Sequence, residues 1–168
     1  MFNKTYVLIT AAKNEESFIE LTIQSVIKQT RMPLKWIIAS DGSTDCTDEI
    51  VKRYEQNYDF IRLVQIKNSS ERNFASKVHA LNLGCDLLKG IEYDFIGILD
   101  ADITFEPEYY EKLINEFESN PRLGLAGGEL YDYYNGDVHK MINSEISVGN
   151  AIQFFRGECF SKIGSFVP

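Results

Sequence analysis

Short apolar runs alternate with segments of helical periodicity along most of this chain, and no other feature constrains its fold as strongly. The run TYVLITAA, residues 5–12, is continuously apolar, which is typical of a strand buried on both faces of a sheet. Further strands are predicted at residues 35–40, 60–66 and 94–99. Repeated strand–helix units of this kind favour a mostly parallel, doubly wound α/β sheet with right-handed crossovers.

The segments between and after these strands have helical patterns. Asn14 is expected to be the N-cap of the first helix. A later helix, within residues 71–89, should end at Gly90. Its apolar face comprises Phe74, Val78, Leu81, Cys85 and Leu88. Pro107 is expected in the first position of the next helix. The inward residues of that helix are Tyr110, Leu113, Ile114 and Phe117.

The chain changes character after Pro121. Asn135-Gly136 lies within an alternating stretch and is a strong signal for a two-residue β-hairpin turn. The last patterned stretch, residues 150–164, is interpreted as a helix that ends at Gly164. We therefore expect one α/β domain, a Rossmann-like, mostly parallel sheet with a small antiparallel appendage.

Composition excludes several classes of function. A chain of 168 residues is long enough for one domain, and its net charge of −8 argues against nucleic acid as the main partner. No apolar run approaches the roughly 20 residues that cross a bilayer, and the N-terminus lacks a signal-peptide pattern. We therefore expect a cytoplasmic protein. Its three cysteines should be reduced and act as small buried side chains: Cys46, Cys85 and Cys159.

Acidic turns follow three of the predicted strands. They are AAKNEE at residues 11–16, SDGSTD at residues 40–45 and DADIT at residues 100–104. In doubly wound sheets, ligands bind at the carboxyl ends of the strands, where the winding reverses direction. If the fourth strand lies on the other side of the first from the second and third, this reversal falls between strands one and four. The three turns would then meet in one crevice.

Asp100 and Asp102 are separated by one residue, and carboxylates this close repel each other unless a positive charge lies beside them. Such a pair suits Mg²⁺ or Mn²⁺, which prefers oxygen ligands and leaves coordination positions for phosphate oxygens. The ion would neutralise a diphosphate leaving group as a Lewis acid. The alternative is structural, since the two aspartates could simply cap the turn before the Pro107 helix.

The turn around Asp41 also allows two interpretations. Asp41 could accept hydrogen bonds from the base or ribose of a nucleoside, with Gly42 permitting close approach. An Asp-Gly pair is equally good turn chemistry and needs no ligand to explain it.

With these segments in this order, the chain resembles the family 2 glycosyltransferases, a group with the GT-A fold. ITAAKNEE resembles the family's opening strand and turn, with Ala11 where Pro is usual. ASDGSTDCT resembles the family's second acidic turn, with Ser40 in place of the first Asp. RNFASKVHALNLG is similar to a helix of the family, and LDADITFEPEYYEKL matches its D-x-D segment closely. NAIQFFRGECFSKIGSF resembles a later segment, so the likeness covers nearly all of the chain.

The resemblance implies a nucleotide-diphosphate sugar as donor and Mg²⁺ or Mn²⁺ as cofactor. By position, the residues that would contact the nucleoside are Ala11, Lys13, Glu15 and Asp41. Asp100 and Ala101 would lie near the ribose and the diphosphate. Asp102 would be the main metal ligand, with Asp100 as a second.

Three further residues are weaker candidates under the same resemblance. Gln153 and Arg156 match the family's later segment and would face the diphosphate or the acceptor, while Lys77 would reach the phosphates. For Lys77 and Gln153, a solvated helix face is an open alternative.

Catalysis is the part of the family pattern that the chain does not match. Family members usually carry a Glu-Asp motif whose Asp is the general base of an inverting displacement, and no such motif occurs before Pro168. We therefore interpret residues 1–168 as an N-terminal catalytic-domain fragment. The acceptor would be a saccharide or a lipid phosphate, the latter needing no base, and membrane association would come only through a further C-terminal part. If the base lies within this chain, Glu158 is the first candidate.

Two other functions compete with this interpretation. GILDADIT also fits the D-x-D-x-T signature of haloacid-dehalogenase-type phosphatases, although that motif usually lies near the N-terminus and requires a downstream Lys and acidic pair. A donor-binding module without catalysis is the second alternative, because the segment expected to carry the base is missing.

Overall fold

A computed structural model of the chain describes residues 4–67, 74–134, 137–140, 148–149, 151–164 and 166. In chain order its elements are β1 (Tyr6–Ala12), α1 (Ile19–Ile27), β2 (Lys35–Ser40), α2 (Thr47–Glu55), β3 (Ile61–Gln65), α3 (Phe74–Leu87), β4 (Phe95–Leu99), α4 (Tyr109–Ser119), β5 (Leu125–Ala126), β6 (Tyr131–Tyr134), β7 (Asp137–Lys140), β8 (Ile152–Arg156) and α5 (Gly157–Ile163). The four strands predicted in the first hundred residues are confirmed.

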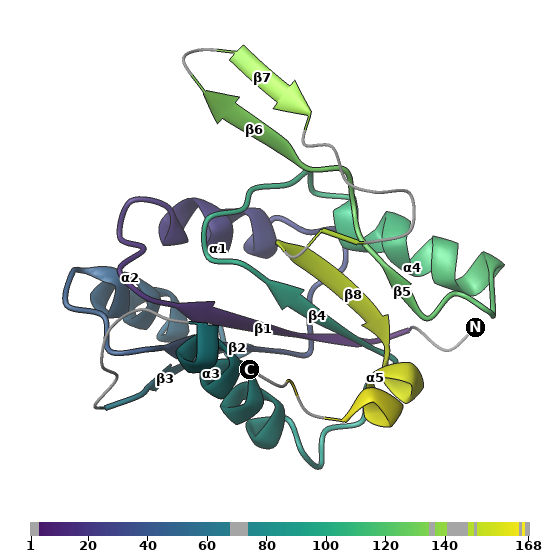
Figure 1. The fold of residues 1–168 in the computed structure, drawn as a ribbon, viewed down its shortest axis with the longest axis horizontal. Coiled ribbons are helices and arrows are strands. Elements are labelled where there is room, and N and C mark those ends of the chain that lie inside the picture. The colour runs from purple at the N-terminus through teal and green to yellow at the C-terminus, as the bar shows by residue number, and fades with distance from the viewer. Residues whose placement is uncertain are drawn as a thin grey trace.

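The main sheet has six strands in the order β3-β2-β1-β4-β8-β5 (Figure 1). Strands β1 to β4 are parallel, whereas β8 runs antiparallel to both of its neighbours, β4 and β5. The sheet is therefore mixed but mostly parallel. The winding reverses between β1 and β4, which is the condition under which the three acidic turns were expected to meet, and this places the carboxyl ends of β1, β2 and β4 at the same edge.

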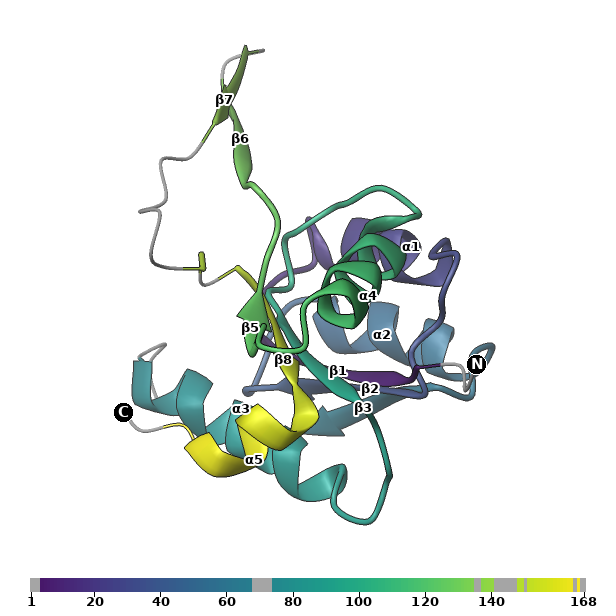
Figure 2. The same cartoon turned by 90° about the vertical axis from the view of Figure 1, so that its right-hand side faces the viewer.

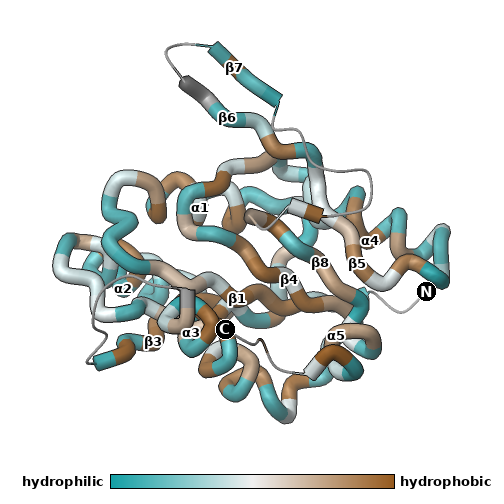
Figure 3. The backbone as a smooth tube through the Cα atoms, in the orientation of Figure 1, coloured by the Kyte–Doolittle hydropathy of each residue, from teal (hydrophilic) through white to brown (hydrophobic). Residues whose placement is uncertain are grey.

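Helices cover both faces of the sheet, because β1 and β4 are apolar on both sides. Tyr6 and Leu8 point into a cluster with α1, α2 and α4, whereas Val7 and Ile9 pack in a second cluster that includes residues of α3 and α5. Figure 2 shows the resulting three layers edge-on. Hydrophobic residues accordingly concentrate along the central strands, while the β6–β7 hairpin is largely hydrophilic (Figure 3). The continuous apolar run at residues 5–12 was therefore interpreted correctly.

The predicted helix at residues 150–164 is wrong over its first half. Residues 152–156 form β8, which pairs with β4 and β5 and places Phe154 on one face of the sheet and Phe155 on the other. Only residues 157–163 are helical, and the helix ends at Gly164 as predicted; its positive φ of 87° is one that glycine adopts readily. A short apolar run without clear periodicity fits a buried strand as well as a helix.

Three local predictions about single residues need correction. Asn14 is not the N-cap of α1; it has a φ of 55°, and the helix begins five residues later at Ile19. Helix α4 begins at Tyr109 rather than at Pro107, although its four inward residues are buried as predicted. Cys46 is exposed, while Cys85 and Cys159 are half-buried; all three are free thiols.

The antiparallel appendage is the β6–β7 hairpin, in which Tyr134 is paired with Asp137. Asn135 and Gly136, the predicted turn, lie outside the described residues. The hairpin projects away from the three layers (Figures 1 and 2). Within the part of the chain that the structure describes, no helix has both the length and the apolar character needed to cross a lipid bilayer.

Candidate active site

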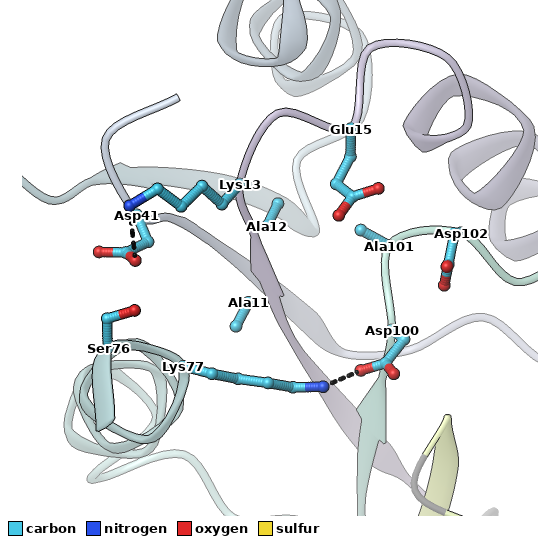
Figure 4. Close-up of a pocket in the computed structure, with 10 residues that line it drawn as sticks. All are labelled: Ala11, Ala12, Lys13, Glu15, Asp41, Ser76, Lys77, Asp100, Ala101 and Asp102. Atoms are coloured by element: carbon cyan, nitrogen blue, oxygen red, sulfur yellow. Dashed lines mark hydrogen bonds and ion pairs between the residues drawn. The ribbon is translucent and has the colours of Figure 1, made fainter. Parts of the chain in front are cut away.

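A cleft of about 370 Å³ opens at the switch point between β1 and β4 (Figure 4). The turns after β1, β2 and β4 line it together with the first turns of α3. The lining residues are Ala11, Ala12, Lys13, Glu15, Asp41, Ser76, Lys77, Asp100, Ala101 and Asp102. The structure thus brings together the three acidic turns and eight of the ten residues singled out from the sequence.

The first two acidic turns are joined by hydrogen bonds that fix their relative position. The backbone N–H of Asn14 donates to Ser43 Oγ at 3.1 Å, and that of Glu15 donates to Thr47 Oγ1 at 2.8 Å. In return, the Thr44 N–H donates to Asn14 Oδ1 at 2.8 Å. The left-handed backbone of Asn14 allows its side chain and its N–H to face the second turn at once.

Asp45 adds to the same junction between the turns. Its carboxylate accepts hydrogen bonds from the backbone N–H of Glu16 and from both the N–H and the hydroxyl of Thr47. Burial alone would raise the pKa of Asp45, but these hydrogen bonds outweigh it and hold the pKa below its usual value. The junction is therefore stabilised by a carboxylate that stays ionised at neutral pH.

Asp41 and Lys13 form one wall of the cleft. Asp41 is only 4% exposed, and its Oδ2 lies 3.5 Å from the Nζ of Lys13. Its backbone N–H donates to the carbonyl of Ala12 at 2.8 Å, which ties the end of β2 to the end of β1. A buried carboxylate in a cleft wall is a strong acceptor for ligand hydroxyl or N–H groups, because little water competes for it.

The D-x-D turn forms the opposite wall. Asp100 Oδ1 lies 2.7 Å from Lys77 Nζ, so an ion pair joins this turn to α3. The carbonyl of Ala101 accepts a buried hydrogen bond of 2.7 Å from Thr22 Oγ1, and the Asp100 N–H donates to Ala151. These contacts fix the backbone of the turn while the side chain of Asp102 stays exposed at the cleft.

The two aspartates fit a metal ion that is shared with a ligand. In the described ranges, no group of three or more His, Cys, Asp or Glu side chains could hold a metal by itself. Mg²⁺ and Mn²⁺ at nucleotide sites are instead held by one or two carboxylates, and substrate phosphates and water complete the coordination. Asp102, with Asp100 beside it, provides such a partial set of oxygen donors.

Comparison with known families identifies the domain. Residues 7–166 match the family model described as "Glycosyl transferase family 2". The chain belongs to this family. The phosphatase interpretation of the D-x-D segment is not supported, because the match extends over nearly the whole chain.

Two relatives within the family are poly-β-1,6-N-acetyl-D-glucosamine synthases. That of Staphylococcus epidermidis is 31% identical over 120 residues, and that of Staphylococcus aureus (strain COL) is 32% identical over the same length. In each case the match covers 71% of this chain and 27% of the relative. The chain thus aligns with about a quarter of these proteins.

Solved structures confirm the GT-A fold. TarS (residues 1–349) of S. aureus in complex with UDP-GlcNAc has a TM-score of 0.74 at 16% identity, over 98% of this chain and 48% of the 1–349 chain. The mannosyltransferase PcManGT of Pyrobaculum calidifontis, in complex with GDP-Man and Mn²⁺, has a TM-score of 0.72 at 16% identity. That match covers 99% of this chain and 48% of PcManGT. At these identities the likeness shows the fold alone.

Two residues from the later family segment do not lie in the cleft. Arg156 pairs with Phe95 at the amino end of β4, the edge of the sheet opposite to Asp100. Its guanidinium donates to the carbonyls of Leu123 and Phe117 and lies over the Phe117 ring. Gln153 is paired with Ile98 within the sheet and is not among the described residues that line the cleft.

Glu158, the alternative candidate for the general base, is also at this far edge. It follows Arg156 by two residues, and its Oε1 lies 3.9 Å from the Nε of Arg156. Its distance from the cleft follows from the strand direction of β8, which carries the chain from Asp100 towards the amino end of β4.

Two residues that line the cleft were missed by the sequence analysis. Ala12 is the last residue of β1 and directly precedes Lys13, so it could have been predicted from the position of the first acidic turn. Ser76 lies on α3 next to Lys77. No signal in the sequence marked it, because its position depends on how the first turns of α3 pack beside β1.

Proposed function

We propose that this domain binds a nucleotide-diphosphate sugar in the cleft and takes part in transferring the sugar to an acceptor, with inversion at the anomeric carbon. The observation that carries the proposal is the convergence of three carboxylate-bearing turns, after β1, β2 and β4, on one cleft of the size of a small-molecule site. Membership of glycosyl transferase family 2 supports it.

The two walls of the cleft suggest a division of labour. We assign the nucleoside to the wall formed by Asp41 and Lys13, where the buried carboxylate would accept hydrogen bonds from base or ribose, with Ala11 and Glu15 beside them. The diphosphate would lie towards the D-x-D turn, near Asp100 and Ala101. Lys77 would then exchange its contact with Asp100 for a phosphate oxygen.

Asp102, assisted by Asp100, would hold Mg²⁺ or Mn²⁺ against the diphosphate. When bound, the ion supplies Lewis-acid stabilisation of the negative charge that develops on the departing nucleoside diphosphate. The structures of PcManGT with GDP-Man and Mn²⁺, and of a mycobacterial glucosyl-3-phosphoglycerate synthase with UDP and Mn²⁺, support a metal of this kind.

The complete reaction stays a proposal, because this chain spans 27% of its curated relatives and about half of the structures it resembles. An acceptor hydroxyl needs a general base within hydrogen-bond reach. Our expectation that this base lies beyond Pro168 stays a prediction. Donor binding without catalysis therefore remains the second candidate function for residues 1–168 alone.

Calorimetric titration of UDP-GlcNAc and GDP-mannose, each with Mn²⁺ and with EDTA, tests the proposal. UDP-GlcNAc is the first choice because TarS was solved with it and the curated relatives are N-acetylglucosamine polymer synthases. We expect metal-dependent binding of at least one donor. Absence of binding by either nucleotide sugar, and by UDP or GDP, would overturn the assignment of the cleft. A hydrolysis and transfer assay on the same sample separates an active enzyme from a binding module.

A further inference from the structure

A second groove of about 780 Å³ adjoins the cleft and shares Asp102 with it. Its walls are the loop that follows the D-x-D turn, residues 102–106, and the segment 128–132 that leads into β6. The groove is also lined by Phe18, just before α1, by Tyr109 and Lys112 on α4, and by Ile152 of β8. Because the proposed function places the metal and the diphosphate at Asp100 and Asp102, a ligand in this groove would lie beside the reacting end of the donor. The sequence did not predict a ligand site here, although the D-x-D segment supplies one wall of the groove.

The groove is lined with aromatic side chains, two of which are unusually exposed. Phe18 is 52% exposed and Tyr131 is 56% exposed, while Phe105 and Tyr109 are half-buried, with their ring centroids 5.1 Å apart. Large exposed apolar groups gathered along a groove mark a ligand site more often than a solvated surface. The flat face of an aromatic ring also matches the C–H face of a pyranose, whose weakly positive hydrogens are attracted to the ring's negative face.

The two walls are held together by a specific contact. The backbone N–H of Gly128 donates to the hydroxyl of Tyr109 at 2.8 Å. A Cβ atom at residue 128 would lie only 2.7 Å from the Tyr109 ring, so this close approach requires glycine. The Tyr109 ring and the segment that carries Tyr131 therefore have a defined spacing before any ligand binds.

Leaving aside Asp102, which the proposed function assigns to a metal ion, the charges along the groove disfavour an anionic ligand. Its acidic lining residues are Asp102, Glu106, Glu129 and Asp132. Among the described residues that line it, Lys112 is the single cation, and it is exposed. Lys140, which does not line the groove, and the hydroxyl of Tyr131 both donate hydrogen bonds to Glu129. Phosphate sites require converging cations or backbone N–H groups, whereas carboxylates accept hydrogen bonds from sugar hydroxyls.

We propose that this groove binds the acceptor and that the acceptor is an uncharged saccharide chain, not a phosphate-bearing molecule. Tyr131 and Phe18 stack on its sugar rings, and Glu106 and Asp132 accept hydrogen bonds from its hydroxyls. The inference rests on the proposed function, since it takes the neighbouring cleft to be the donor site. It decides between the two acceptor classes, saccharide and lipid phosphate, that the sequence left open.

The test uses calorimetry to compare the affinities of the 168-residue chain for two matched probes. One probe is an N-acetylglucosamine tetrasaccharide, and the other is the same tetrasaccharide carrying a 1-phosphate. The uncharged probe should bind more tightly. Tyr131→Ala should weaken its binding about threefold to tenfold, the loss expected for one stacked ring. Tyr131→Phe should retain it. Val138→Ala is the control, because Val138 is 65% exposed on the same hairpin but outside the groove. Phe18→Ala provides a second variant remote from the hairpin.

Titration of UDP with Mn²⁺ on every variant separates this inference from the proposed function. If the wild-type chain does not bind UDP or GDP, the donor cleft itself is wrongly assigned. If a nucleotide binds, any one of three outcomes would overturn the assignment of this groove to the acceptor, while leaving the donor cleft unaffected. They are no binding of the uncharged tetrasaccharide, equal or tighter binding of its phosphorylated form, and an effect of Tyr131→Ala and Phe18→Ala no larger than that of Val138→Ala.

Discussion

The Nζ atom of Lys77 lies 2.7 Å from the Oδ1 atom of Asp100, so a cation from α3 faces the first aspartate of the D-x-D turn. A metal ion that uses Asp100 must compete with this amine for the same oxygen. The pair is partly exposed, and ion pairs of this kind contribute up to about 1 kcal/mol. If the two aspartates bind a metal as proposed, Lys77 would lower their affinity for an ion that arrives without a nucleotide.

Lys77→Met should raise the affinity for Mn²⁺ alone about twofold to fivefold, because it removes the competing charge. The same variant should weaken binding of UDP with Mn²⁺ if Lys77 moves to the phosphates. Lys89→Met is a suitable control, since Lys89, just after α3, forms a more exposed ion pair with Asp86 outside the cleft. Electron paramagnetic resonance of Mn²⁺ measures the first effect and calorimetry the second. Unchanged Mn²⁺ affinity in Lys77→Met would contradict the competition.

Asp102→Asn should remove the metal dependence of nucleotide binding. The side chain of Asp102 is exposed at the cleft, so the substitution changes its charge without disturbing packing. The affinity for UDP in Mn²⁺ should fall at least about tenfold, towards the value measured in EDTA, since even outer-shell changes cost this much. Asp137→Asn on the exposed strand β7 should have no effect. A metal-dependent affinity equal to that of the wild type would assign the ion to other residues.

Asp41→Ala tests the nucleoside wall separately from the metal. A buried charge-assisted hydrogen bond contributes roughly 1.5–3 kcal/mol, so affinity for UMP or GMP should fall about tenfold to a hundredfold even in EDTA. Because Asp41 also faces the Lys13 amine, thermal unfolding must be recorded beside binding. A variant that remains folded and binds the monophosphate as well as the wild type does would leave Asp41 with a turn-forming role only.

The sequence predicted one crevice for the three acidic turns on the condition that the winding reverses between β1 and β4, and the observed strand order meets this condition. The apolar runs that became β1 and β4 are buried on both faces, and acidic turns follow β1, β2 and β4 directly. Once the winding reverses between β1 and β4, the turns meet. The position of Ser76 could not be predicted, because it depends on the packing of α3, which local periodicity does not specify.

The misplacement of Arg156 has a physical origin in β8. The run around Phe154 and Phe155 is apolar on consecutive residues, a pattern that a buried strand and a buried helix share. As a helix after the hairpin, it could have directed Arg156 towards the diphosphate. As a strand antiparallel to β4, it carries Arg156 to the far edge, where backbone carbonyls satisfy its guanidinium. The family resemblance identified this segment correctly, but it did not indicate that residues 152–156 form a strand.

The pH dependence of stability should depend in part on Asp94, which lies at that far edge. Burial tends to raise the pKa of Asp94. The ammonium of Lys4, 2.7 Å away, and hydrogen bonds from Thr5 outweigh this effect and lower the pKa below its usual value. Because the folded-state pKa is depressed, the contribution of Asp94 is fully present above its unfolded-state pKa of about 3.9. It is lost as the pH falls through the lower, folded-state value.

Asp94→Asn should therefore lower the free energy of unfolding at pH 7 by up to about 1 kcal/mol, a figure that allows for the partial exposure of the ion pair. The difference from the wild type should shrink as the pH falls below about 4. The Asp94 carboxylate of the wild type is then protonated, first in the unfolded state and at lower pH in the folded state as well. Urea denaturation between pH 7 and pH 3 measures both effects. Asp86→Asn, which breaks the exposed pair with Lys89, is the control and should change stability little at any pH. A deficit in Asp94→Asn that stays constant down to pH 3 would show that its cause is lost packing rather than charge.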